Sequence, residues 1–121
     1  MDSISKLSRV SGPRCAEKVK VMYAMSADSK VRRKLKKAKV LGKYKAKNIN
    51  GMPCYKKGKK KNARVICYIG GKWRIGNSKK AITYARSPED VACPEYTGDT
   101  WKYKKGKHSF GLGDDFTITA V

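Results

Sequence analysis

The sequence has few of the residues that enzymes use for acid–base chemistry. It contains one histidine, His108, and nine acidic residues among 121. His108 ends the lysine-rich stretch 104–108, and Glu89-Asp90 and Asp114-Asp115 are adjacent pairs whose side chains point apart. No GxxxxGK[ST] motif occurs, and Gly111-x-Gly113 precedes an expected strand rather than a helix. We therefore expect a protein that is not an enzyme and that holds no cofactor or metal.

Long apolar runs are also missing. No stretch approaches the roughly 18 residues needed to cross a membrane, and residues 1–10 lack the basic start and apolar centre of a secretory signal. These absences predict a soluble, intracellular protein that does not bind membranes.

The four cysteines, Cys15, Cys54, Cys67 and Cys93, are scattered without a CxxC pair. This spacing does not favour zinc, although four thiolates could still converge in space. Cys54 and Cys67 could form a disulfide if they face each other across a hairpin. Without a secretion signal we expect all four cysteines to be buried free thiols.

What the chain has in excess is positive charge. Thirty Lys and Arg give a formal net charge of +21, spread along the whole sequence. A folded protein tolerates such a charge when a partner supplies the opposite one, so a polyanion is expected. Lysine outnumbers arginine, 23 to 7, and lysine contacts phosphate rather than base edges. The composition thus predicts sequence-tolerant binding of nucleic acid, either RNA or DNA.

Residues 1–38 differ from the rest and are interpreted as a basic N-terminal arm that becomes ordered on its partner. The spacing of the apolar residues in 16–23 fits a helix and a strand equally well. Residues 29–39 predict a short basic amphipathic helix, with Val31, Leu35 and Ala38 on one stripe and Asp28 or Ser29 as its cap. On this division, a fragment of residues 39–121 is expected to fold by itself.

Residues 39–121 predict a small antiparallel β domain, a barrel or a sandwich, because short β-rich runs alternate with Gly, Asn and Pro. The sharpest hairpin signal is Gly70-Gly71, and Asn50-Gly51 is the second. Strands are expected at 40–46, 52–57, 63–69, 73–76, 81–86, 100–104 and 116–121.

Four basic clusters contain no acidic residue: 32–39, 43–47, 56–64 and 102–107. Surfaces that are merely soluble mix both signs, so these clusters are interpreted as phosphate-binding. The expected contact residues are Arg32, Arg33, Lys34, Lys36, Lys37, Lys56, Lys57, Lys59, Lys60, Lys61, Arg64, Lys102, Lys104, Lys105 and Lys107.

The aromatic residues have two interpretations, since rings among lysines suit both a stacking surface for single strands and an ordinary β core. Trp73 and Trp101 are assigned to the core, because a domain this small has few other bulky residues. Tyr55 and Tyr103 lie beside lysines and are added to the expected contact residues.

Several spaced motifs suggest a relationship. The patterns are GxY at 42–44, NGxPxY at 50–55, GKWRIG at 71–76, YARS at 84–87 and GDTW at 98–101. Over roughly residues 40–121 the chain resembles a small β module of multidomain proteins from marine invertebrates and protists. That module often occurs in tandem copies and has no assigned activity. This chain departs from it in having one copy and more basic loops, so the resemblance implies a fold but no site.

Two functions fit these features. The first is a structural protein that binds nucleic acid in a ribonucleoprotein or a genome-containing particle. The second is a minor capsid or shell protein that cements larger subunits of a virus particle. A weaker third alternative is a module that binds acidic glycans or a matrix.

Overall fold

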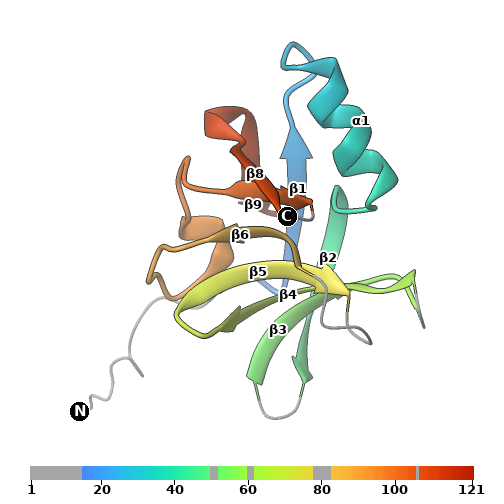
Figure 1. Cartoon of the computed structure of the whole chain (residues 1–121). Coiled ribbons are helices and arrows are strands. Elements are labelled where there is room, and N and C mark those ends of the chain that lie inside the picture. The colour runs from blue at the N-terminus through green and yellow to red at the C-terminus, as the bar shows by residue number, and fades with distance from the viewer. Residues whose placement is uncertain (1–14, 50–51, 60–61, 78–82, 106) are drawn as a thin grey trace.

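A computed structural model of the chain describes residues 15–49, 52–59, 62–77, 83–105 and 107–121. Nine antiparallel strands form one sheet in the order β8-β7-β6-β5-β4-β3-β2-β1-β9. The sheet curls into a half-barrel, and the only α-helix of the described residues, α1 (Ser29–Lys37), lies at one of its ends (Figure 1). The prediction of a mainly β protein is confirmed.

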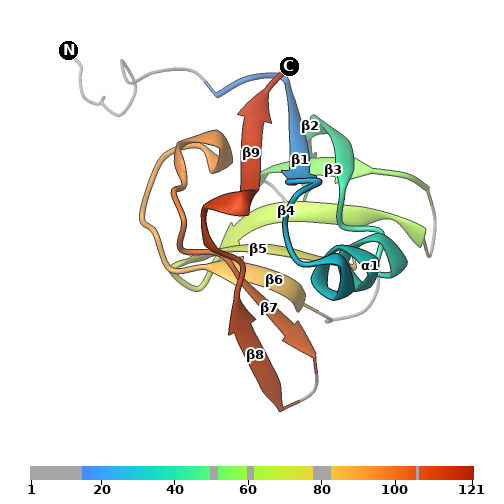
Figure 2. The same cartoon turned by 90° about the horizontal axis from the view of Figure 1, so that it is seen from above.

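The strands run β1 (Lys18–Tyr23), β2 (Gly42–Ile49), β3 (Met52–Lys57), β4 (Arg64–Ile69), β5 (Lys72–Asn77), β6 (Thr83–Ser87), β7 (Lys102–Lys105), β8 (His108–Gly111) and β9 (Phe116–Ala120). Two short 3₁₀ turns, η2 (Pro94–Tyr96) and η3 (Gly113–Asp115), precede β7 and β9. The strands from β1 to β8 follow one another in the sheet in sequence order, whereas β9 returns to pair with β1 (Figure 2).

The Gly70-Gly71 turn joins β4 to β5 as the sequence predicts. Ile69 pairs directly with Lys72, which leaves a two-residue turn with φ of 62° and 79°. Positive φ at both positions is the requirement of a primed turn, and glycine meets it without strain. Ile49 and Met52 pair in the same way, although residues 50 and 51 lie outside the described part.

The predicted arm is wrong for residues 15–38, because they belong to the folded domain. β1 lies between β2 and β9, and Val19 and Val21 are buried in the core. The helix adds Leu35, which is also fully buried. The rest of the predicted arm, residues 1–14, lies outside the described residues.

Helix α1 has the predicted apolar stripe, and Asp28 is its N-terminal cap. Asp28 Oδ1 accepts hydrogen bonds from the backbone N–H groups of Lys30 (2.8 Å) and Val31 (3.3 Å). The helix ends where Lys39 takes a left-handed φ of 61°, and Val40 N donates to Leu35 O at 3.1 Å. This reversal turns the chain back into β2.

The expectation of free thiols is wrong, because all four cysteines are paired. Cys15 bonds to Cys93 and Cys54 bonds to Cys67. Cys54 and Cys67 are opposite each other on β3 and β4, the arrangement that the sequence left open. The first bond fastens the chain just before β1 to the segment just before η2.

Replacing Trp101 by Ala is expected to cost about 3–5 kcal/mol of the free energy of unfolding, as truncating a buried ring usually does. Trp101 is 1% exposed, packs 5.5 Å from the Phe116 ring and donates its Nε1–H to Thr97 Oγ1 at 2.7 Å. Urea denaturation would measure the loss. Tyr96→Ala, at a side chain 45% exposed, is the control and should cost less than about 1 kcal/mol. A small loss for Trp101→Ala would contradict its role in the core.

Candidate polyanion-binding face

The outer face of β1, β2 and β3 carries a set of lysines that we call the lysine ladder: Lys18, Lys20, Lys43, Lys45 and Lys56. They alternate with the core residues Val19, Tyr44 and Tyr55, so they point away from the core. The alternation places every lysine of the ladder on one face.

The strand register sets these lysines directly opposite one another. Lys18 pairs with Lys45, Lys45 pairs with Lys56, and Lys20 pairs with Lys43. Like charges opposite each other across strands destabilise a sheet. In the part of the chain that the structure describes, no lysine or arginine forms an ion pair with a carboxylate. The ladder therefore has no carboxylate partner within the described residues.

A second row crosses β5, β6 and β7 on the same outer side of the sheet. Arg74 is opposite Arg86, and Arg86 is opposite Lys102, while the neighbouring Ile75, Ala85 and Tyr103 face the core. The guanidinium of Arg74 donates from Nε to Ile69 O at 3.2 Å. β4, which carries Val65 and Cys67 on this face, separates this second row from the ladder.

An open hollow of about 420 Å³ adjoins the ladder along β2 and β3. Its lining residues are Lys45, Ala46, Lys47, Lys56, Gly58 and Lys59. Lysines two apart on a strand are about 7 Å apart, and neighbours across strands about 5 Å. Such a grid suits the repeated charges of a polymer better than one small anion.

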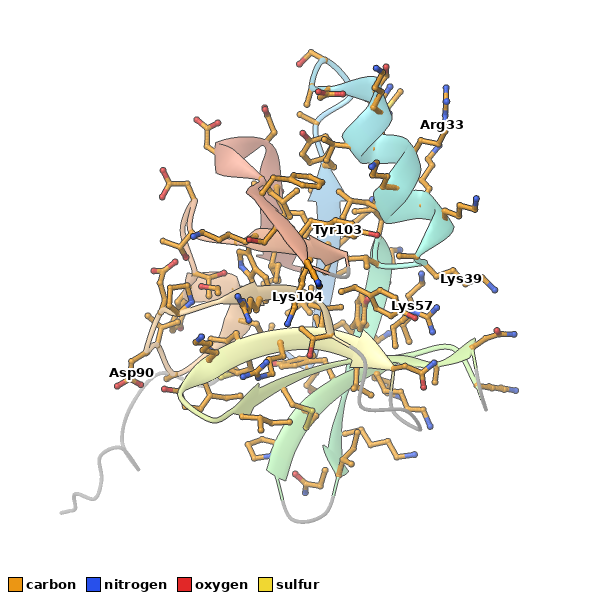
Figure 3. The ribbon with its side chains drawn as sticks, viewed as in Figure 1. Arg33, Lys39, Lys57, Asp90, Tyr103 and Lys104 are labelled. Carbon is orange, nitrogen blue, oxygen red and sulfur yellow. A yellow bond between two sulfur atoms is a disulfide. The ribbon has the colours of Figure 1, made fainter. Side chains whose placement is uncertain are left out.

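Two of the expected contact residues point inward instead. Lys57 Nζ donates to Lys39 O (2.9 Å) and Leu41 O (2.6 Å), and Arg64 Nε donates to Ala38 O (2.7 Å). Both cations therefore contact carbonyl groups at or just after the end of α1, where positive charge is favourable. Figure 3 shows Lys57 beside Lys39 below the end of the helix. Burial, followed by the charges of Arg64 and Lys39, lowers the pKa of Lys57.

The side chain of Arg64 is also buried and contacts an aromatic ring. It is 7% exposed, and its guanidinium lies 4.7 Å from the centre of the Tyr84 ring. Gly42 faces Lys57, and with a φ of 126° a Cβ there would lie 3.0 Å from Lys57 Cε. Lys57 and Arg64, both predicted to contact nucleic acid, have side chains that fasten α1 to the sheet.

Tyr55 and Tyr103 are also core residues, which corrects their assignment as contacts. Tyr55 is 4% exposed and donates its hydroxyl to Ala16 O at 2.6 Å; burial raises its pKa to about 12. Tyr103 is 5% exposed, and its ring packs 5.4 Å from Phe110. In this structure neither ring is exposed for stacking on a base.

The other predicted residues have varied positions. Arg33, Lys34, Lys36 and Lys37 are exposed on α1, and Arg33 points away from the body of the protein (Figure 3). Arg32 is half-buried and donates to Met25 O at 2.8 Å. Lys56 is half-buried, while Lys59, Lys102, Lys104 and Lys107 are exposed. Lys60 and Lys61 lie outside the described residues, as does the side chain of Lys105.

Sequence reasoning missed most of the ladder and both arginines of the second row. An alternating pattern of lysine and apolar residues could have predicted it, because a period of two puts the lysines on one face of a strand. The pattern occurs in Lys18-Val19-Lys20-Val21 and in Lys43-Tyr44-Lys45. The stretch 43–47 was recognised as a basic cluster, but its residues were not placed among the contacts.

Comparison with family models, with curated proteins and with solved structures finds no match to this chain. Among the described residues, no three His, Cys, Asp or Glu side chains are grouped as a metal site would require. Likewise, within those residues no helix has the length and apolar character of a membrane-crossing segment.

Proposed function

We propose that this protein is a non-enzymatic structural protein that binds nucleic acid through the outer face of its sheet, in a ribonucleoprotein or genome-containing particle. The observation that carries the proposal is the register of the ladder, which sets Lys45 between Lys18 and Lys56 without an internal counter-charge. Backbone phosphates supply that counter-charge in a regular row, and their neutralisation releases condensed cations.

The buried tyrosines narrow the mode of binding. With Tyr55 and Tyr103 inside the core, the proposed contacts are lysine and arginine to phosphate, without base stacking. Phosphate contacts carry no direct sequence information. The protein should therefore bind composition-matched oligonucleotides of different sequence with nearly equal affinity.

The ladder is tested by Lys45→Gln/Lys56→Gln, with Lys36→Gln/Lys37→Gln on α1 as a control that removes the same charge. We expect the ladder variant to lose roughly tenfold or more in affinity for a duplex at 0.1 M salt, and its salt slope to fall by about 2. Fluorescence anisotropy over a salt series measures both quantities. Equal losses in the two variants would show that net charge alone drives binding and would refute a ladder site.

The disulfides favour a second candidate function. Disulfides persist in oxidising compartments, where sulfated glycans are abundant polyanions. The same ladder would bind sulfate groups as readily as phosphates, because lysine acts as a point charge. Competition between heparin and duplex at 0.15 M salt separates the candidates: displacement of the duplex at equal charge concentration supports the glycan, and its retention supports nucleic acid.

A further inference from the structure

The last strand of the sheet, β9, has an unpaired edge. Its one partner is β1, and the pairing is bounded by hydrogen bonds from Ala24 N to Asp115 O and from Val121 N to Lys18 O, both 3.0 Å. Because backbone groups alternate along an antiparallel strand, the N–H and C=O groups of Phe116, Ile118 and Ala120 face the other edge. No strand of the described residues lies there.

η2 packs against β9 and covers part of this edge, but β9 itself carries none of the residues that usually block pairing. Edge strands are commonly blocked by lysine, proline or a bulge. Residues 116–121 read FTITAV and contain neither a charge nor a proline. In a chain with 30 basic residues, a terminal strand without one is a local exception.

A hollow of about 240 Å³ lies alongside the edge. One wall is β9, from Phe116 to Thr119, and the other is Thr97, Gly98 and Asp99, with Asp114 also lining it. The space therefore combines free backbone groups on one side with two carboxylates.

The two segments that meet at this hollow are acidic, although Lys20 of the ladder lies opposite Thr119 on the neighbouring strand. Segments 87–101 and 109–121 contain six of the nine acidic residues and no lysine or arginine. Asp90, in the first segment, lies on the opposite side of the molecule from Arg33 in the view of Figure 3. A partner with positive side chains is thus attracted to this part of the surface.

We propose that the free edge of β9 binds an extended, basic peptide segment of a partner protein by strand addition. The peptide backbone pairs with Phe116, Ile118 and Ala120, and its lysine or arginine side chains lie against Asp99 and Asp114. A second copy fits less well, since joining two β9 edges would bring the carboxylates of both copies together. Its residues differ from those of the lysine ladder, although Lys20 of the ladder pairs with Thr119 on β9.

The test is an NMR titration of the full ¹⁵N-labelled chain with the synthetic peptide Lys-Val-Lys-Val-Lys-Val. We expect shifts at the amides of Phe116, Ile118 and Ala120 and at residues 97–99. Asp114→Asn should weaken binding roughly two- to fivefold, as loss of a partly exposed charge pair does, whereas the matched Asp115→Asn should change it little, since Asp115 does not line the hollow. Ala120→Pro should abolish the shifts at β9, because it removes one edge donor without removing a bond to β1.

Three results would overturn the proposal. The first is a set of shifts confined to other strands, and the second is an equal loss of affinity for Asp114→Asn and Asp115→Asn. The third is the same shifts at β9 on raising the protein concentration without peptide, which would make a second copy the occupant. The peptide Glu-Val-Glu-Val-Glu-Val is the control and should leave the β9 amides unshifted.

Discussion

A fragment of residues 39–121 is expected not to fold, in contrast to the expectation from the sequence. Without residues 18–23, β2 loses one neighbour and β9 loses the strand that connects it to the sheet. Val19, Val21 and Leu35, each at most 1% exposed, leave the core at the same time. Each such loss costs about 2–5 kcal/mol, and together they are comparable to the roughly 5–15 kcal/mol that stabilises a typical domain.

Circular dichroism and the dispersion of an amide NMR spectrum would measure this outcome. The matched control is residues 15–121, which keep β1, α1 and Cys15. This longer fragment should unfold cooperatively, with a free energy of unfolding within about 1 kcal/mol of that of the full chain. Cooperative folding of residues 39–121 would instead support the domain boundary near residue 39 that the sequence predicts.

Removing the Cys15–Cys93 bond by replacing both residues with Ala is expected to lower the free energy of unfolding by about 4–5 kcal/mol. The bond closes a loop between residues 78 apart in sequence, and it therefore restricts the unfolded chain strongly. It also holds the residues before β1 beside η2, where Ala16 N donates to Glu95 Oε2 at 2.7 Å. Guanidinium denaturation of the variant and of the unchanged protein would measure the difference.

The control for this change is the removal of the second bond by Cys54→Ala/Cys67→Ala. Its residues are 13 apart in sequence, so its loss should cost less, about 3 kcal/mol. Their opposite positions on β3 and β4 also mean that backbone pairing still holds the two strands together. A larger loss for the 54–67 pair than for the 15–93 pair would contradict the chain-restriction argument.

Local patterns predicted most of the sheet. All seven expected strands exist, and β3 has the expected bounds, because turn residues such as Gly70-Gly71 act over a few positions. β8 was missed because His108–Gly111 is short and lies in a glycine-rich stretch read as a loop. β1 could not be decided, because its pairing with β9 joins distant parts of the sequence.

The site was harder to predict than the fold, because it depends on strand register. Lys18, Lys45 and Lys56 are far apart in sequence and become neighbours only when three strands are aligned. The opposite error arose for Lys57 and Arg64, whose place in a basic run suggested exposure. The two residues lie opposite each other on the inner face, next to the end of α1. Their side chains therefore donate hydrogen bonds to backbone carbonyl groups. Charge alone does not tell which way a strand residue points.

The Cys15–Cys93 bond also determines how mechanical tension would pass through the protein. A pull on residue 15 from the N-terminal side and on residue 121 from the C-terminal side enters the bond at Cys15 and leaves it at Cys93. Residues 16–92 then lie in a side loop of the covalent path and carry no backbone tension while the bond is intact. The strands β1 to β6, which include the whole lysine ladder, are thus shielded from force applied at the chain ends. Such force would stretch the segment of β7, β8 and β9 first.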